Sequence, residues 1–278
     1  MVDGIIHSLL FPHVKLNIDR LHRKLQGKTV VITGASYGIG EALASLLAMK
    51  GVHLVLIART KERLEAIKQV LTEKGAEVDI YALDLRLEEN RRHLIEELRR
   101  YPEGVDYLIN NAGKSICRTL EDSVDRFHDY TQTMALNYFA PVELCLDLYE
   151  SLKRNRGHII SISAVNVLLL PAPRWTAYQA SKSAFDQWLR AASPELYVDG
   201  VNTTSVYLPL VRTRMIEPTE IYKKAPALSP EHAARIIAKS VLSCRSYYKP
   251  WWLKFGELGS LLIRPVWKRI AIFLFLRK

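Results

Sequence analysis

Tyr178 and Lys182 are the residues of this chain whose types and spacing most directly suggest catalysis. They lie four residues apart in the sequence YQASK, so a helix would place both side chains on one face. A free phenol has a pKa of about 10 and is a poor acid or base at neutral pH. A neighbouring ammonium group favours the phenolate and lowers the pKa of the phenol toward the working range. The pair therefore predicts proton transfer by Tyr178, although the same pattern alone is common at protein surfaces.

A glycine-rich turn, TGASYGIG at residues 33–40, follows the first apolar run and precedes a helical pattern. Gly34, Gly38 and Gly40 would permit a tight turn, close approach of the backbone to a pyrophosphate, and close packing of helix on strand. The free N–H groups of the helix N-terminus would then face the phosphates. Glycine turns are common in sheet proteins, so it is the placement between strand and helix that predicts a dinucleotide site.

The second apolar run ends at Arg59. Sites that prefer NAD usually place an acidic residue here, which binds the hydroxyl groups of the adenosine ribose. A guanidinium group would instead pair with the 2′-phosphate of NADP. Arg59 therefore favours NADP(H) as the cofactor, and the alternative is a solvated arginine at a strand end.

In their order and spacing, these motifs resemble the short-chain dehydrogenase/reductase family. The match includes the sequence NNAG at residues 110–113 and Asn137, and it covers roughly residues 28–243. Residues 110–116, 125–139 and 207–223 are similar to bacterial fatty acyl-CoA and long-chain aldehyde reductases. The resemblance implies a Rossmann fold that carries hydride transfer with a nicotinamide cofactor.

The resemblance also implies a role for each matching side chain. Tyr178 would protonate a carbonyl oxygen, or act as the base in the reverse oxidation. Lys182 would lower the pKa of Tyr178 and hold the nicotinamide ribose, and Asn137 would anchor a water that relays protons to Lys182. Asp84 would contact the adenine, Asn111 would lie beside the adenosine ribose, and Thr213 would meet the nicotinamide amide. The expected cofactor-binding residues are Gly34, Ser36, Gly38, Ile39, Gly40, Arg59, Asp84, Asn111, Tyr178, Lys182 and Thr213.

One departure from the family pattern concerns the serine that usually contacts the substrate. In an alignment without a gap along the fifth apolar run, this serine falls on Ala164, and the loop before Tyr178 has one extra residue. Ser163 is the candidate to replace it. Adjacent residues of a strand point to opposite faces, so Ser163 could act directly only if the loop rearranges. The alternative is a strand-end hydroxyl bonded to the backbone.

The elements that must position these residues follow a strand–helix alternation. Short, β-branched apolar runs, typical of strands covered on both faces, are separated by segments of helical length. This alternation predicts an α/β fold: a single Rossmann-type, doubly wound parallel sheet. We expect a domain at residues 28–244, with amphipathic N- and C-terminal appendages at residues 1–27 and 245–278. The expected strands are Thr29–Thr33, Val52–Ala58, Val78–Leu83, Val105–Asn110, His158–Ser163 and Val201–Leu208. The expected helices are Gly40–Lys50, Lys61–Lys74, Glu88–Arg100, Arg126–Lys153 and Thr176–Val198.

The composition is that of a globular protein, with 278 residues, 49% of them hydrophobic and 24% charged. Its cysteines, Cys117, Cys145 and Cys244, are far apart and form no CxxC pair. This spacing argues against a disulfide framework and a zinc site, so we expect no metal and a reducing, cytoplasmic compartment.

The net charge of +10 is concentrated at the chain ends. Residues 1–28 and 245–278 carry all of the excess, and both segments are rich in large apolar side chains. This combination favours the surface of an anionic membrane over nucleic acid as a partner. Neither segment is an uninterrupted membrane span, because charged residues and prolines break both. Alternatively, the C-terminal segment packs on its own domain or on a second subunit.

Together these features favour an NADPH-dependent reductase of a hydrophobic, lipid-like carbonyl compound: a fatty aldehyde, an acyl-CoA or a keto-lipid. The alternatives are a reductase of a smaller ketone and a non-enzymatic nucleotide-binding relative. By resemblance, we expect a homodimer whose seam involves the segments Arg126–Tyr149 and Thr176–Val198.

Overall fold

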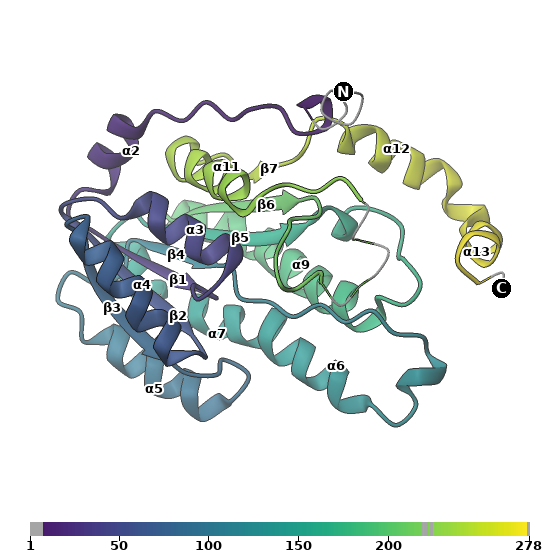
Figure 1. Ribbon diagram of the computed structural model, residues 1–278, viewed down its shortest axis with the longest axis horizontal. Coiled ribbons are helices and arrows are strands. Elements are labelled where there is room, and N and C mark those ends of the chain that lie inside the picture. The colour runs from purple at the N-terminus through teal and green to yellow at the C-terminus, as the bar shows by residue number, and fades with distance from the viewer. Residues whose placement is uncertain (1–7, 218, 220–221, 223–224, 277–278) are drawn as a thin grey trace.

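The computed structural model describes residues 8–217, 219, 222 and 225–276. Its centre is one seven-stranded sheet in the order β3-β2-β1-β4-β5-β6-β7, in which all neighbouring strands are parallel (Figure 1). The strands are β1 (Lys28–Thr33), β2 (Val52–Ala58), β3 (Glu77–Ala82), β4 (Tyr107–Asn110), β5 (His158–Ala164), β6 (Asn202–Leu208) and β7 (Tyr247–Tyr248). The strand order reverses direction between β1 and β4. In such sheets ligands bind at the carboxyl ends of the strands, beside this reversal. The predicted doubly wound fold is confirmed.

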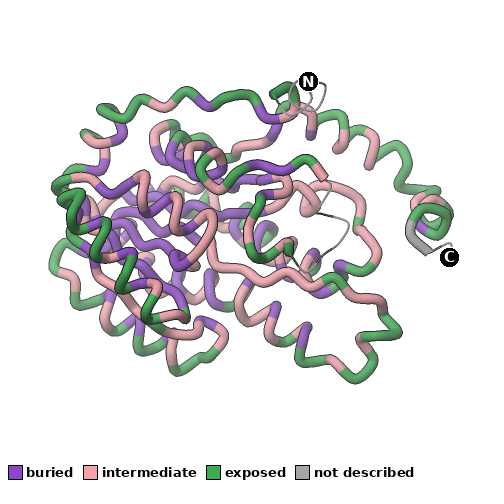
Figure 2. The backbone as a smooth tube through the Cα atoms, in the orientation of Figure 1, coloured by how far each residue is buried: buried purple, intermediate pink, exposed green. Residues whose placement is uncertain are grey.

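Helices cover both faces of the sheet and bury its strands (Figure 2). Val30 and Ile32 of β1 face one helical layer, and Val31 between them faces the other. Such burial on both sides explains why these strands read as continuous apolar runs. One layer contains α2 (Ile18–Leu25), α3 (Gly38–Leu47), α4 (Lys61–Glu73) and α11 (Pro230–Ser243). The other contains α5 (Glu88–Arg99), α7 (Ala140–Asp147), α8 (Tyr149–Arg154) and α9 (Thr176–Val198).

The segment expected as one helix over 126–153 is divided. It forms α6 (Phe127–Met134), a π-helical turn at Ala135–Phe139, then α7 and α8. Pro141 has no N–H to donate to the carbonyl four residues before it, so the α-helical pattern cannot continue there. The N–H of Ala140 instead bonds to the carbonyl of Ala135, five residues back. The wider turn places Asn137 in the interior, where it is 1% exposed.

The terminal segments are partly built into the body. Leu21 and Leu25 of α2 are fully buried in the core, and β7 extends the sheet beyond residue 244. The indole N–H groups of Trp251 and Trp252 donate to the carbonyls of Leu9 and Leu10, which joins the two ends of the chain.

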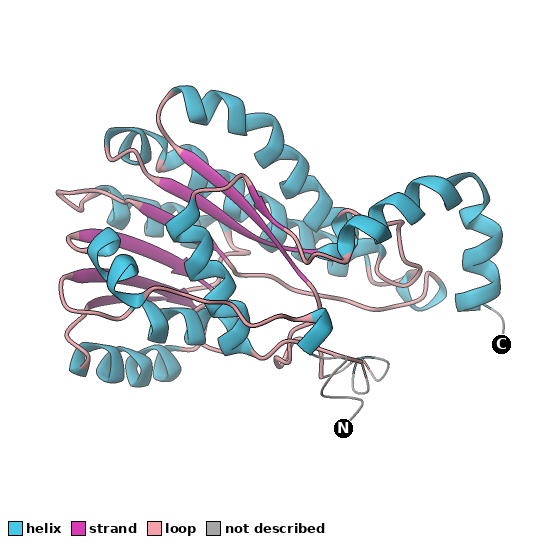
Figure 3. Ribbon diagram, turned by 90° about the horizontal axis from the view of Figure 1, so that it is seen from above, coloured by secondary structure: helices cyan, strands magenta, loops and turns pink. Residues whose placement is uncertain are grey.

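After these tryptophans, α12 (Leu253–Ile263) and α13 (Trp267–Ala271) project away from the layered body (Figure 3). We call residues 253–276 the C-terminal arm. Among the described residues, no helix combines the length and the apolar character that a membrane crossing requires.

Candidate active site

Tyr178 and Lys182 lie on successive turns of α9, at the end of the sheet where β5 terminates. The ammonium of Lys182 donates to the carbonyl of Ile162 in β5, at 2.9 Å. Burial lowers the pKa of Lys182 to about 8, so this ammonium deprotonates far more readily than an exposed lysine. This hydrogen bond to the end of β5 therefore fixes the position of the Lys182 ammonium, one turn after Tyr178 on α9.

The surroundings of Tyr178 favour the protonated form of its phenol. The sequence predicted that Lys182 would lower the pKa of the Tyr178 phenol, but burial, with a smaller contribution from Tyr222, raises it above its ordinary value. Among the residues that the structure describes, none forms a hydrogen bond with the Tyr178 hydroxyl. The phenol is thus protonated and free to donate, which is the state that protonation of a carbonyl oxygen requires.

Asn137 lies in the π-helical turn and forms hydrogen bonds with the loop after β4 and with α9. Its side-chain amide donates to the carbonyl of Lys114 at 3.0 Å and to the hydroxyl of Ser181 at 2.9 Å. Its Oδ1 accepts the N–H of Lys114 at 2.9 Å. A Cβ added at Gly113 would lie 3.4 Å from both Asn137 Oδ1 and Lys182 Nζ. The structure therefore brings Asn137, Gly113 and Lys182 together, and glycine leaves space between the two polar groups.

The glycine turn lies against the segment that follows β6. Gly34 and Gly38 have φ values of +70° and +59°, in the left-handed region that favours glycine. A Cβ at Gly38 would lie 2.8 Å from the methyl group of Thr213, so glycine is what allows this close approach. The N-terminus of α3 and Thr213 consequently border one cleft. Ser36 is buried within the turn, and Ile39 and Gly40 lie in the first turn of α3.

Asn111 holds the turn to the sheet. Its amide donates to the carbonyls of Thr33 and Gly34, at 2.9 and 3.1 Å. In this structure both of its donors serve the protein itself, so contact with a ribose would use its oxygen.

Arg59 is exposed at the carboxyl end of β2, next to the glycine turn. Asp84, after β3, is engaged by Arg86, whose hydrogen bonds lower the pKa of its carboxyl, with a smaller contribution from Arg59. No described carboxylate forms an ion pair with Arg59, which leaves its guanidinium available for an external anion. An adenine contact by Asp84 would have to be shared with Arg86.

Ser163 and Ala164 end β5, and the methyl of Ala164 supplies no hydroxyl at the position expected for one. Ser163 is 5% exposed, and its Oγ is covered and has no hydrogen-bond partner among the described residues. It pairs in register with Tyr207 of β6, whose hydroxyl donates to Asp186 of α9 at 2.7 Å. Ser163 thus faces α9, but a substrate would reach its hydroxyl only after the covering residues move.

Comparison with known proteins identifies the family. A family model described as short chain dehydrogenase matches residues 28–223. The chain belongs to the short-chain dehydrogenase family. This short-chain dehydrogenase carries the paired tyrosine and lysine, the asparagine and the glycine turn at one edge of its sheet, and it is an oxidoreductase of this type.

Its similar relatives include two named as fatty acyl-CoA reductases. The Acinetobacter baylyi protein is 45% identical over 227 residues, covering 81% of this chain and 77% of that one. A Mycobacterium tuberculosis protein is 39% identical, covering 76% and 72% of the two chains.

Among solved structures, a metagenomic short-chain oxidoreductase in complex with NADP superposes with a TM-score of 0.69 and 26% identity. This match covers 81% of this chain and 96% of that chain. L-sorbose reductase from Gluconobacter frateurii, complexed with NADPH and L-sorbose, gives a TM-score of 0.72 and 26% identity, covering 80% and 94%.

Tyr222 lies in the segment 207–223 that resembles fatty acyl-CoA reductases, but the sequence assigned it no role of its own. It lines the cleft together with Gly38 and Thr213, and its electrostatic effect reaches Tyr178. A lone tyrosine in a segment without regular periodicity gives no signal by itself. Only the folded chain brings its ring against Trp175, at the start of α9.

Proposed function

We propose that this short-chain dehydrogenase is an NADPH-dependent reductase of a carbonyl group in a long-chain, lipid-like substrate. The observation that carries the proposed reaction is the convergence of Tyr178, Lys182 and Asn137 beside the glycine turn. The similarity to fatty acyl-CoA reductases supports the substrate class, and the NADP and NADPH complexes of its structural neighbours support the cofactor.

The residues around the cleft fit such a cofactor. The N-terminus of α3 presents N–H groups where a pyrophosphate would lie, and Arg59 is placed for a 2′-phosphate. The buried ammonium of Lys182 has donors left for a ribose hydroxyl after its bond to Ile162. When bound, NADPH supplies a hydride to the carbonyl carbon.

In the proposed mechanism, Tyr178 gives its proton to the carbonyl oxygen as negative charge develops there. The Lys182 ammonium stabilises the phenolate that remains. Asn137 fixes the loop at Lys114 beside that ammonium, from which a water-relayed proton would restore the phenol. The products are an alcohol and oxidised cofactor. With a thioester substrate, departure of the thiol after hydride addition would give an aldehyde. Ser163 would contribute a hydrogen bond only in a rearranged loop.

The experiment that tests this function follows NADPH consumption by the unaltered protein with matched long and short substrates. Fatty aldehydes, fatty acyl-CoAs and 3-keto lipids are each paired with a short-chain counterpart. We expect consumption with at least one long-chain class and a lower kcat/KM for its short counterpart. Activity confined to small ketones would instead place this chain with reductases such as the L-sorbose enzyme. No consumption with any carbonyl would leave a nucleotide-binding protein.

The choice of NADPH over NADH should depend on Arg59. Loss of a charge-assisted hydrogen bond costs about 1.5–3 kcal/mol, or roughly ten- to a hundredfold in affinity. We expect Arg59→Ala to reduce the preference for NADPH, which is the ratio of the NADPH and NADH affinities, by that factor. Fluorescence titration with each nucleotide measures these affinities. Lys61→Ala is the control. Lys61 lies two residues after Arg59, and its exposed side chain forms an ion pair with Glu65. Equal affinity of the unaltered protein for both nucleotides would contradict the assignment.

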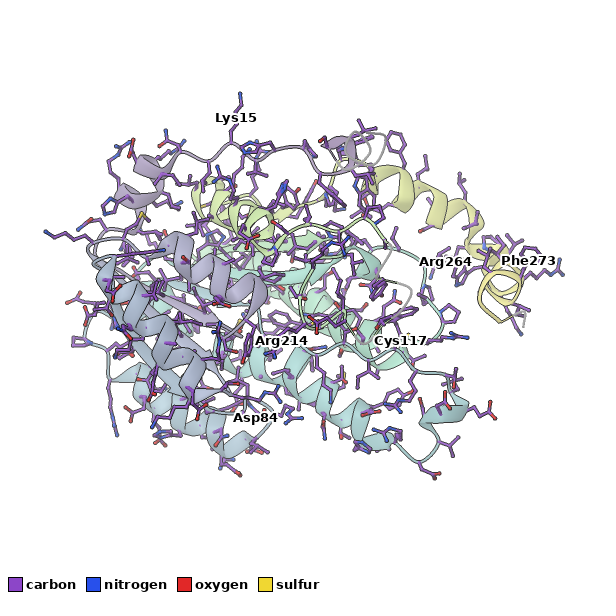
Figure 4. The ribbon with its side chains drawn as sticks, in the orientation of Figure 1. Lys15, Asp84, Cys117, Arg214, Arg264 and Phe273 are labelled. Carbon is purple, nitrogen blue, oxygen red and sulfur yellow. The ribbon has the colours of Figure 1, made fainter. Side chains whose placement is uncertain are left out.

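We further propose that the C-terminal arm contacts the surface of an anionic membrane. Large apolar side chains are exposed along it, including Phe255 and Leu262, both 69% exposed, and Leu261, 66% exposed. Figure 4 shows Phe273 and Arg264 on its projecting part. A surface this apolar is uncommon on a monomer in water and usually marks a contact site.

The charge of the C-terminal arm favours lipid over another apolar protein surface. Arg264, Lys268 and Arg269 are all exposed among the apolar side chains, and each basic residue near an anionic membrane contributes about 1 kcal/mol. Trp251 and Trp252, at the base of the arm, are side chains that favour the headgroup level. Because these indoles bond to Leu9 and Leu10, the N-terminal segment would lie at the same surface.

Removal of residues 256–278 should release the protein from liposomes that contain anionic lipid, measured by co-sedimentation at low salt. The triple variant Arg264→Glu, Lys268→Glu and Arg269→Glu keeps the apolar surface and should also lose most binding. Vesicles of neutral lipid serve as the control. Intact protein that ignores anionic liposomes would show that the arm serves the fold or an oligomer.

A homodimer through α7 and α9 is also proposed. Leu146 of α7 and Tyr197 and Val198 of α9 are 63%, 72% and 85% exposed in the single chain. A second copy of these helices would cover such apolar side chains.

A further inference from the structure

The open cleft beside the glycine turn is lined by the phenol of Tyr222, a residue distinct from Tyr178. Ala164 cannot donate a hydrogen bond, and the hydroxyl of Ser163 is covered. On the side of the site formed by β5 and α9, a carbonyl oxygen beside Tyr178 would therefore accept one hydrogen bond, from the Tyr178 hydroxyl. Oxygen atoms that develop negative charge in a transition state are commonly stabilised by more than one donor. The remaining donor should come from across the cleft.

Tyr222 lies across the cleft, in the segment after β6. Its N–H donates to the carbonyl of Thr219 at 2.9 Å, which fixes its backbone in a turn. Its ring lies 5.7 Å from the ring of Trp175, at an interplanar angle of 34°. Trp175 directly precedes α9 and is 8% exposed, so it is a rigid support one turn before Tyr178. The aromatic pair holds the Tyr222 ring against the start of the catalytic helix.

The surroundings place Tyr222 between this cleft and the start of α9. It lines a cleft of about 450 Å³ together with Gly38, Thr213 and neighbouring residues of the glycine turn and the segment after β6. Burial raises the pKa of Tyr178, and Tyr222 adds a smaller contribution, in keeping with the contact of its ring with Trp175 one turn before Tyr178. Burial raises the pKa of Tyr222 to about 12, which keeps this phenol protonated at neutral pH.

We propose that the hydroxyl of Tyr222 donates the second hydrogen bond to the substrate carbonyl oxygen, in place of the hydroxyl that is missing at Ala164. The inference rests on the proposed reductase function. Tyr178 transfers its proton to the oxygen, whereas Tyr222 keeps its own proton and stabilises the charge that develops. The trapped carbonyl lies between the two phenols, with its carbon directed toward the glycine turn and Thr213.

Tyr222→Phe tests this role because it removes the hydroxyl and keeps the ring that packs on Trp175. We expect kcat/KM for carbonyl reduction to fall by about 10²-fold, the usual effect of losing one such donor. NADPH affinity should stay within threefold, which also reports that the variant is folded. Ala164→Ser in the Tyr222→Phe background should recover at least tenfold, because it restores a donor on the opposite side.

Two results would overturn the inference while leaving the proposed function intact. Tyr222→Phe with kcat/KM within threefold of the unaltered enzyme would show that its hydroxyl does not touch the reacting oxygen. A loss that Ala164→Ser does not recover would assign Tyr222 a packing role. If the unaltered protein reduces no carbonyl at all, the proposed function fails, and this inference fails with it.

Discussion

Tyr178→Phe is expected to lower the turnover number by about 10³-fold or more while leaving NADPH affinity within a few-fold. General acid catalysis contributes about 10²- to 10⁴-fold, and in the proposed mechanism Tyr178 is the proton donor. The phenyl ring retains the packing of the side chain, and its hydroxyl has no hydrogen bond in the described structure to lose. Steady-state NADPH oxidation and a fluorescence titration of NADPH measure the two quantities.

Tyr130→Phe is a matched control for this variant. It also removes a phenolic hydroxyl, which bonds to Thr176 at the start of α9, at 2.9 Å. A large loss confined to Tyr178→Phe identifies the acid. Undiminished reduction by Tyr178→Phe would remove this residue from the mechanism.

Lys182→Ala should lose turnover to a similar extent and should also weaken NADPH binding by about ten- to a hundredfold. In the proposed mechanism one ammonium stabilises the phenolate and donates to the ribose, so both effects are expected. A hydrogen bond to a charged group contributes about 1.5–3 kcal/mol. Arg190→Ala is the control, since it removes a cation two turns further along α9 that pairs with Asp186 at 3.8 Å. Loss of turnover with unchanged NADPH affinity would contradict the double role.

The lowered pKa of Lys182, about 8, adds a pH dependence. Below this pKa the ammonium is charged and can donate, and above it the charge is lost, so binding and turnover should decline as the pH rises. Because kcat/KM reports the free enzyme, we expect kcat/KM for NADPH to fall above about pH 8. A profile that stays flat to pH 9.5 would show that the charge of Lys182 is not needed.

The sheet and the main site could be predicted from sequence because their signals are local. Continuous apolar runs identified six of the seven strands, and the glycine turn identified the junction of β1 and α3. The four-residue spacing of Tyr178 and Lys182 on a helix was also sufficient to place them side by side. The roles of the individual site residues stay predictions.

The features of the fold and the site that the sequence did not predict depend on contacts between segments that are distant in the chain. The two residues of β7 carry no periodicity and become a strand only by pairing with β6. The π-helical turn that buries Asn137 follows from Pro141, but the helical pattern around it conceals the break. The burial of the Ser163 hydroxyl and the packing of Tyr222 on Trp175 arise where β5, α9 and the segment after β6 meet, which no sequence window contains.

The most direct test of the proposed function is transfer of hydride from the cofactor to a long-chain carbonyl. The unaltered protein would be incubated with hexadecanal and NADPH deuterated at both C4 positions, and the alcohol analysed by mass spectrometry. The proposed mechanism predicts hexadecanol that carries a single deuterium on its carbinol carbon, and none above background with Tyr178→Phe. Absence of the alcohol, or alcohol without deuterium, would contradict it.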